Sequence, residues 1–153
     1  MIQFEQKWLN GSVSLGAVTG WTADEMRLVS ELGYALAKQG QNQEAIVIFE
    51  GLMVLAPATT YFEAALGALW LRENNPARAL PHLNAALAAD SGDITSRINR
   101  GEVFLNLENY EEARTDLNFV LRQKKSAESN ALNEQSFVRA RALLFAVERF
   151  SRP

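Results

Sequence analysis

The residues that could carry out chemistry are few in this sequence of 153 residues. It holds one histidine, His82, and no cysteine, so thiolate nucleophiles, disulfides, thiolate metal sites and multi-histidine metal sites are excluded. The carboxylates Glu108, Glu111 and Glu112 have the spacing of a solvated helix start, where negative charge suits the helix dipole. No phosphate-binding loop, nucleophile elbow or dinucleotide fingerprint occurs. The sequence therefore predicts a protein that is not an enzyme and has no cofactor or metal.

Charge and hydropathy argue against two further classes. The 15 basic and 18 acidic residues give a net charge of −3, whereas a general nucleic-acid binder needs surplus Lys and Arg to neutralise phosphates. The longest uncharged stretch near the start, residues 8–23, is interrupted by glycines and falls short of the roughly 18 consecutive apolar residues of a membrane span. We expect a globular domain without nucleic-acid partner or membrane insertion, and the absence of cysteine fits the reducing cytoplasm.

Small residues recur with a period of 34. Two rows share this period: Gly33, Gly67 and Gly101, and Ala45, Ala79 and Ala113. Small residues at such places let two antiparallel helices approach closely, and each helix pair leaves an apolar face that the next pair can cover. The period predicts three helix pairs, with each glycine packed against the alanine of its own unit. The units are 26–59, 60–93 and 94–127.

Local signals predict helix ends and two irregularities. Thr22 and Glu25 have the spacing of a capping box, and Asp93 is a candidate N-cap. Pro81 lies inside the predicted second helix of the middle unit; because it lacks a backbone N–H, it should kink that helix or delay its start. Arg100 precedes Gly101 in the third unit, at the place where the other two units have the apolar residues Leu32 and Leu66.

This pattern resembles the tetratricopeptide repeat. Within that superfamily, residues 49–57, followed by Tyr61-Phe62 and Leu66-Gly67-Ala68, resemble the first-to-second-repeat junction of the class II type III secretion chaperones. These small acidic proteins of the bacterial cytoplasm hold hydrophobic translocator proteins through an extended segment in a concave groove.

The resemblance implies an all-α fold and a chaperone function. We expect a single tetratricopeptide domain over residues 1–153, in which three helix-pair repeats form a short right-handed solenoid. The solenoid would carry an N-terminal extension, residues 1–22, and a C-terminal capping helix, residues 128–150. The implied partner is a hydrophobic secreted client, and the implied location is the cytoplasm.

The first helix of each unit should line the inner wall of such a stack. Side chains at the second, fifth, ninth and twelfth places would face the concavity. The wall is largely apolar, and its small residues leave depressions that suit short apolar anchors of an extended peptide. The predicted groove residues are Arg27, Ser30, Tyr34, Tyr61, Ala64, Ala68, Leu71, Ile98, Glu102 and Leu105.

Two alternative binding functions of the fold were compared with the residues present, and one of them stays open. The basic clamp that recognises acidic C-terminal tails is absent, because its places hold Ser30, Tyr34, Ala65, Thr95 and Asn99. The open alternative is a tetratricopeptide scaffold or assembly subunit that binds a folded cytoplasmic partner through the groove or the convex face.

The two ends of the chain carry further apolar residues. Phe4, Trp8, Leu9 and Trp21 lie outside the repeats, so they either cap the first helix pair or form a dimer contact. The family resemblance, in which the N-terminal region takes part in dimer formation, favours a weak homodimer. At the other end, residues 128–150 predict a capping helix whose arginines could alternatively meet an acidic partner.

Overall fold

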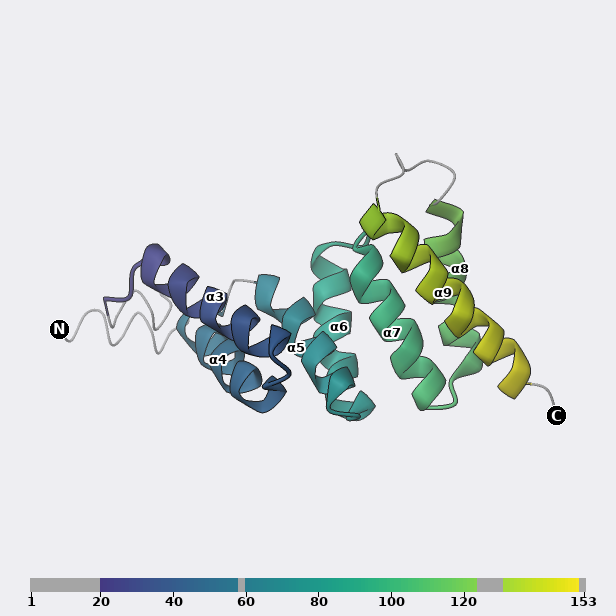
Figure 1. The fold of residues 1–153 in the computed structure, drawn as a ribbon, viewed down its shortest axis with the longest axis horizontal. Helices are drawn as coiled ribbons and strands as arrows, with labels where there is room; N and C mark the ends of the chain where they lie inside the picture. Colours follow the sequence, from purple (N-terminus) through teal and green to yellow (C-terminus); the bar gives the residue numbers. More distant parts are fainter. Residues whose placement is uncertain (1–19, 58–59, 124–130, 152–153) are drawn as a thin grey trace.

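Seven helices and no strand are formed by the residues that the computed structural model describes, which are 20–57, 60–123 and 131–151. The helices follow one another along an elongated stack, with α3 near one end and α9 at the other (Figure 1). The predicted all-α fold class is confirmed. The helices are α3 (Ala23–Lys38), α4 (Asn42–Leu55), α5 (Tyr61–Arg72), α6 (Pro76–Ala89), α7 (Ile94–Asn106), α8 (Tyr110–Gln123) and α9 (Ala131–Phe150).

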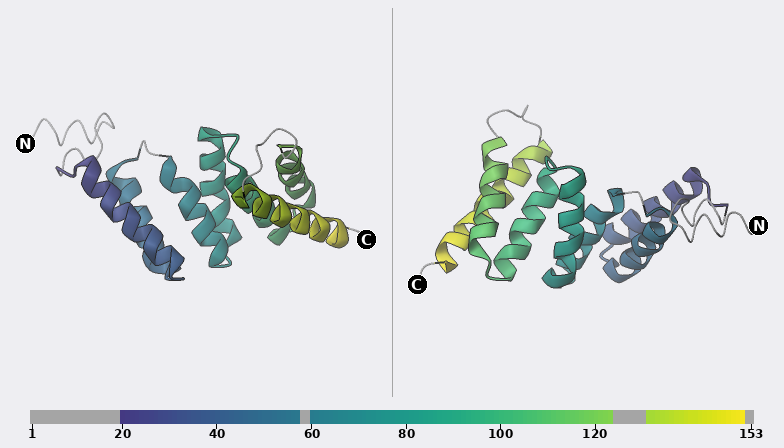
Figure 2. Two further views of the ribbon diagram at one scale, coloured as in Figure 1. Left: turned by 45° about the horizontal axis from the view of Figure 1, so that its top comes forward. Right: turned by 180° about the vertical axis from the view of Figure 1, so that it is seen from behind.

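Helices adjacent in sequence pack as pairs, and the pairs stack. The closest packing joins α3 to α4, α5 to α6 and α7 to α8, while α4 meets α5 and α6 meets α7. Figure 2 shows this succession with the top tilted forward and from behind. Helix α9 then packs on both α7 and α8, which is the place of a capping helix. Since α5 also contacts α7 and the Tyr34 ring of α3 meets the Tyr61 ring of α5, the first helices of successive pairs form one wall.

The glycine column brings the paired helices together, but the side chain that fills the gap differs from the one expected. A Cβ added at each of the three glycines would have as its nearest neighbours Phe49 Cζ at 2.9 Å, Leu83 Cγ at 2.5 Å and Leu117 Cγ at 2.9 Å. These residues stand four places after the predicted alanines, which are themselves fully buried. The reason is that a helical side chain leans toward the N-terminus of its helix and covers the preceding turn.

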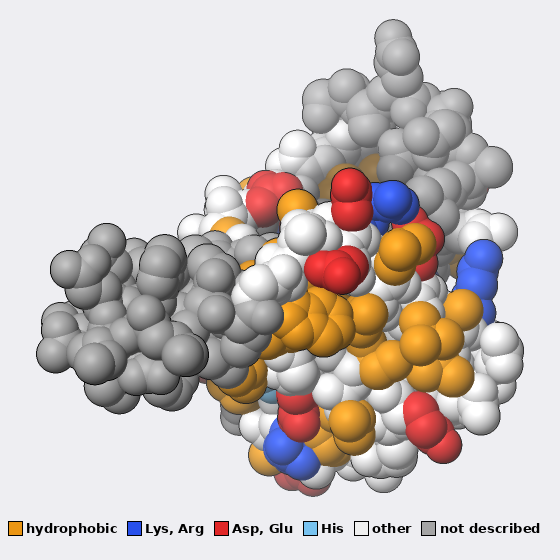
Figure 3. Space-filling view, turned by 90° about the vertical axis from the view of Figure 1, so that its left-hand side faces the viewer, with side chains coloured by type: hydrophobic (Ala, Val, Ile, Leu, Met, Phe, Trp, Pro, Cys, Tyr) orange, Lys and Arg blue, Asp and Glu red, His pale blue; other side chains and the backbone are white. Residues whose placement is uncertain are grey.

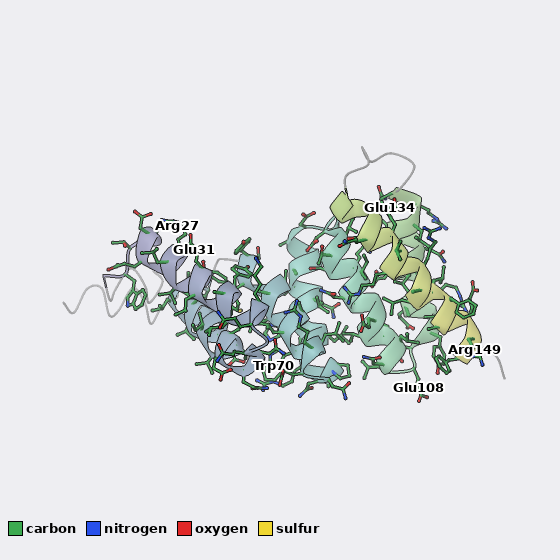
Figure 4. All side chains as sticks on the ribbon, viewed as in Figure 1. Arg27, Glu31, Trp70, Glu108, Glu134 and Arg149 are labelled. Carbon is green, nitrogen blue, oxygen red and sulfur yellow. The ribbon has the colours of Figure 1, made fainter. Side chains whose placement is uncertain are left out.

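The turns inside the three pairs repeat the same backbone geometry. Gly40, Asn74 and Glu108 are again 34 residues apart and have positive φ angles of 80°, 53° and 60°. In each case the next backbone N–H donates to a carbonyl five residues earlier, at 2.8–3.0 Å, which closes the preceding helix with a left-handed residue. Glu108 therefore lies in the turn between α7 and α8 (Figure 4). The expectation that it begins a helix is wrong, because α8 starts at Tyr110.

The predicted helix ends are largely confirmed. Thr22 Oγ1 accepts from the Glu25 N–H at 3.2 Å, and the Glu25 carboxylate accepts from the Thr22 N–H at 2.8 Å, so the capping box is present. The hydrogen bonds that the carboxylate accepts from the Thr22 N–H and hydroxyl lower the pKa of Glu25. Asp93 caps α7 through the Thr95 N–H. The expectation that Pro81 delays its helix is wrong, since α6 begins at Pro76 and continues through the exposed Pro81 to Ala89.

A buried cluster of charged residues explains why Arg100 stands where the other units have leucine. Asp116 is 2% exposed and accepts two hydrogen bonds from Arg100, at 2.7 and 2.8 Å, and one from Arg97 at 3.0 Å. Arg100 also donates to Asn84 of α6 at 2.9 Å. Arg97 donates to the Ser91 carbonyl and stacks on a phenyl ring. The guanidinium groups thus satisfy one carboxylate and join the second helix pair to the third.

Candidate functional site

Several hollows lie along the wall formed by α3, α5 and α7. One of about 700 Å³ is lined by residues of α3 that include Tyr34 and by Arg72 of α5, and two smaller ones differ in their chemistry. The first, called the aromatic hollow, lies between α3 and α5; it has a volume of about 260 Å³ and is lined by Ala23, Met26, Arg27, Ser30, Ala56, Tyr61 and Phe62. The second, called the polar hollow, lies between α5, α7 and α9; it has a volume of about 370 Å³ and is lined by Ala68, Leu71, Arg72, Thr95, Asn99, Glu102 and Arg139.

Two tyrosines give the wall its most exposed aromatic surface. Tyr61 is 64% exposed and Tyr34 is 37% exposed, and their rings meet edge to face with centroids 6.2 Å apart. Tyr34 packs on Phe49 at 4.9 Å and Tyr61 on Phe62 at 5.7 Å, so core rings hold both in place. Burial raises the pKa of Tyr34, and the neighbouring Tyr61 side chain raises it further. The Tyr34 phenol therefore stays neutral and can donate a hydrogen bond at neutral pH.

The polar groups of α3 in this region already form hydrogen bonds or ion pairs within the helix. Ser30 is 8% exposed, and its hydroxyl donates to the Arg27 carbonyl at 2.7 Å. The Arg27 guanidinium lies 2.6 Å from Glu31 and 3.8 Å from Asp24, and Figure 4 shows Arg27 and Glu31 on neighbouring turns of α3. Local carboxylates offset the charge of Arg27, so the aromatic hollow favours apolar groups.

The polar hollow has a different chemistry because α7 and α9 supply polar side chains. Glu102 of α7 pairs with Arg139 of α9 at 2.6 Å, and this pair joins the two helices at the wall. Arg72 of α5 donates to the Ala37 carbonyl at 3.3 Å. Leu71 and the small Ala68 contribute the apolar part of the lining.

The expectation that Ile98 faces the groove is wrong. Ile98 is 2% exposed and belongs to the core that α9 forms with α7 and α8, together with Phe137 and Val147. Leu105 is partly buried and packs against the same core. The third helix pair therefore offers polar side chains to the wall where the sequence predicted apolar anchors. Of the other predicted residues, Arg27, Ser30 and Tyr61 line the aromatic hollow. Ala68, Leu71 and Glu102 line the polar hollow, and Ala64 is half-buried on α5.

Four residues of the polar hollow were missing from the predicted groove set, although one of them, Thr95, stands at a place that was expected to face the concavity. Arg72 and Asn99 directly follow the predicted residues Leu71 and Ile98 in the sequence. Helical spacing alone could not decide which residue of each neighbouring pair faces the wall. Arg139 had no signal in the sequence, since only the packing of α9 against α7 brings it to Glu102.

The N-terminal end of the stack presents a second apolar surface. Leu28 and Leu32 of α3 are 57% and 52% exposed, and Val47 of α4 is 69% exposed. Figure 3 shows hydrophobic side chains gathered on this end. Trp21 is 40% exposed and lines a neighbouring hollow with Leu28. The other predicted capping or dimer residues, Phe4, Trp8 and Leu9, lie outside the described residues.

His82 lies in a contact between two helices. His82 Nδ1 lies 2.6 Å from Glu63 Oε2, and both side chains are largely buried, so the histidine joins α6 to α5. No group of three or more metal-ligating side chains gathers in residues 20–57, 60–123 and 131–151. In the same ranges, no helix has the length and apolar character needed to cross a bilayer.

Comparison with known proteins assigns the fold. No family model and no curated protein matches the sequence. The chain is similar to the type III secretion chaperone SycD of Yersinia enterocolitica in complex with a peptide of the translocator YopD, at 21% identity and a TM-score of 0.71, over 86% of this chain and 98% of that one.

Two further solved structures share the fold. PcrH of Pseudomonas aeruginosa, in complex with the chaperone binding region of PopD, is 20% identical with a TM-score of 0.74, over 86% of this chain and 96% of that one. The first tetratricopeptide domain of Spaghetti (RPAP3), bound to an HSP90 peptide, is 21% identical with a TM-score of 0.70, over 84% and 94%. The chain therefore has the fold of tetratricopeptide domains and of translocator chaperones.

Proposed function

We propose that this protein is a cytoplasmic chaperone that holds a hydrophobic secreted client of the type III translocator kind, by binding an extended segment along α3, α5 and α7. The observation that carries the proposal is the exposed pair Tyr34 and Tyr61 beside the aromatic hollow. Large apolar side chains held rigidly beside a hollow are typical of a surface that binds a partner.

The chemistry of the wall suits a peptide better than a charged ligand. In the aromatic hollow Arg27 is offset by acidic neighbours, and in the polar hollow Arg139 is offset by Glu102. The similar chaperones SycD and PcrH are bound to translocator segments, and this supports the same class of client here.

Binding of an acidic C-terminal tail is less well supported. The similar RPAP3 domain holds a peptide of the acidic sequence SRMEEVD. At the places of the basic clamp this chain has Ser30, Tyr34, Ala65, Thr95 and Asn99, none of which carries positive charge. A scaffold that binds a folded partner is the remaining alternative, and it predicts that partner binding survives changes in the aromatic hollow.

Tyr61→Glu should reduce client binding by at least about 30-fold, because a charge replaces a central aromatic contact worth about 2 kcal/mol or more. Tyr61 is 64% exposed, so folding should be little affected. Leu105→Glu is a poorer test because Leu105 packs against the core. The measurement is co-purification of the client from the native cytoplasm, with thermal unfolding recorded for each variant.

Phe145→Glu is the matched control for this experiment. Phe145 lies on α9 and is 66% exposed, so the same charge is introduced on an exposed aromatic away from both hollows. The control should retain the client. Retention by Tyr61→Glu as well would place the binding surface elsewhere and favour the scaffold.

We also propose that the N-terminal end of the stack is a homodimer contact. Leu28, Leu32 and Val47 leave apolar area exposed there, and burial of apolar area contributes about 25 cal/mol per Å² before the cost of association. The similar chaperone SycD has been solved in an alternative dimer.

The double variant Leu28→Glu/Leu32→Glu should be monomeric at concentrations where the unchanged protein is dimeric. Both side chains are more than half exposed, so the monomer should still fold. Sedimentation across a concentration series measures the effect, and deletion of residues 1–20 tests whether the preceding segment contributes. If the unchanged protein sediments as a monomer at high concentration, the surface serves as a cap and the dimer is excluded.

A further inference from the structure

The hollow of about 700 Å³ on the wall carries an excess of positive charge. It is called the basic hollow, and it lies between the second half of α3 and the last residue of α5. Its lining residues are Glu31, Tyr34, Ala35, Ala37, Lys38 and Arg72. The Glu31 carboxylate is already paired with the Arg27 guanidinium at 2.6 Å. The charges left in the hollow are therefore those of Lys38 and Arg72.

These two cations differ from the others that line the wall. In the aromatic hollow Arg27 lies within ion-pair distance of two carboxylates, and in the polar hollow Arg139 is paired with Glu102. No carboxylate of residues 20–57, 60–123 and 131–151 forms an ion pair with Lys38 or Arg72. Since the whole chain has a net charge of −3, two unbalanced cations at one place run against its overall charge and favour an anionic occupant.

Most donor groups of these two side chains have no partner in the described part of the chain. Arg72 donates one hydrogen bond, from Nη1 to the Ala37 carbonyl at 3.3 Å, which ties the guanidinium to the end of α3. Its other N–H groups and the Lys38 ammonium form none there. Both side chains are exposed. A planar guanidinium with free N–H groups matches the two oxygens of a carboxylate.

The aromatic surface of the wall continues into the basic hollow. Tyr34 lines this hollow, and its ring meets the ring of Tyr61, which lines the aromatic hollow. Ala35 and Ala37 add two small side chains. An extended segment that places an apolar side chain at Tyr61 can therefore bring a neighbouring residue to the two cations.

We propose that the basic hollow binds a side-chain carboxylate of the client segment, with Arg72 donating paired hydrogen bonds and Lys38 supplying a second positive charge. This inference rests on the proposed function and deepens it, because it requires an Asp or Glu beside the apolar anchor of the client. It differs from recognition of an acidic C-terminal tail, since it needs no terminal carboxylate. The places of the basic clamp also hold no cation in this chain.

The experiment begins with peptides selected for binding. A library of random peptides is panned against the full chain, and several unrelated binders are synthesised with an acetylated N-terminus and an amidated C-terminus, so that only side chains supply carboxylates. Each binder should contain one Asp or Glu whose change to Asn or Gln weakens binding about tenfold, the value of one charge-assisted contact. Lys38→Gln/Arg72→Gln should weaken the unchanged peptides by a similar factor.

A double-mutant cycle tests whether the two losses are one interaction. Once the acidic side chain of the peptide is neutralised, Lys38→Gln/Arg72→Gln should cause no further loss. The matched control is Arg122→Gln/Arg141→Gln, which removes the same charge from exposed arginines of α8 and α9. The control should leave binding unchanged, whereas a loss equal to that of Lys38→Gln/Arg72→Gln would reduce the effect to overall charge and overturn the subsite.

Inorganic phosphate distinguishes a free anion from a client carboxylate. At equal ionic strength phosphate should displace the peptides no better than chloride does, because the proposed occupant also needs the contact at Tyr61. Displacement by phosphate but not by chloride would assign the two cations to a free anion and overturn the proposal.

The remaining results separate this inference from the proposed function. If no peptide is selected, or if Tyr61→Glu leaves the selected peptides bound, the groove function fails and this inference fails with it. If the peptides bind through Tyr61 but lack a required acidic residue, or if the double-mutant cycle shows no coupling, the groove function stands and the carboxylate subsite is overturned.

Discussion

Asp116→Ala should lower the free energy of unfolding by about 3 kcal/mol, because it leaves two guanidinium groups largely buried without their carboxylate. Asp116 is 3% exposed at its side chain, and Arg97 and Arg100 are 15% and 21% exposed. For a chain of this size such a loss lowers the thermal midpoint by about 6–12 °C. Thermal and urea unfolding, followed by circular dichroism, measure the change.

The surface pair between Arg114 and Glu111 is the control for this prediction. It also joins an arginine to a carboxylate, but Glu111 is 81% exposed, and water and salt weaken such pairs. Glu111→Ala should therefore change stability little. Asp116→Asn, which keeps the shape but removes the charge, should fall between the two. An unchanged midpoint for Asp116→Ala would show that the arginines find other partners.

Gly67→Leu should destabilise the middle helix pair by about 3 kcal/mol, at the upper end of the cost of overpacking. Even a Cβ at this position would lie 2.5 Å from Leu83 Cγ and 3.3 Å from the Leu83 backbone nitrogen. Leu83 is fully buried, so it cannot move into solvent, and the two helices must separate. The free energy of unfolding measured in urea tests this, and a stability equal to that of the unchanged protein would contradict the close approach.

Gly51 provides a matched control within the same fold. A Cβ there meets nothing within 4 Å, and Gly51 lies inside α4. Gly51→Ala should stabilise the protein by about 0.5–1 kcal/mol, since alanine restricts the unfolded chain and favours a helix. Gly67→Ala should act in the opposite direction, and its cost should be smaller in a protein that already carries Leu83→Ala, which a double-mutant cycle measures.

The repeat architecture could be predicted from the sequence because it depends on local and periodic signals. A 34-residue period of small residues gives the number and order of helix pairs. The caps at Thr22 and Asp93 depend on residues only two or three places away. Such signals do not need the rest of the fold, so pattern and structure agree.

Only part of the proposed binding wall could be predicted in the same way. The exposed Tyr34 and Tyr61 followed from helical spacing within one helix and between neighbouring units. Ile98 did not, because its spacing is that of a groove residue while α9 covers it. A helix position specifies a direction from the helix axis, and whether that direction meets solvent depends on what packs there.

The class of fold, the succession of helix pairs and the aromatic part of the wall all follow from the order of residues along the chain. Which side chains meet across helices was settled by the packed stack: Arg100 with Asp116, and Glu102 with Arg139. The physical reason is that spacing along one helix is set by the backbone, whereas these contacts depend on the relative rotation and offset of different helices, which follow from packing of the whole stack.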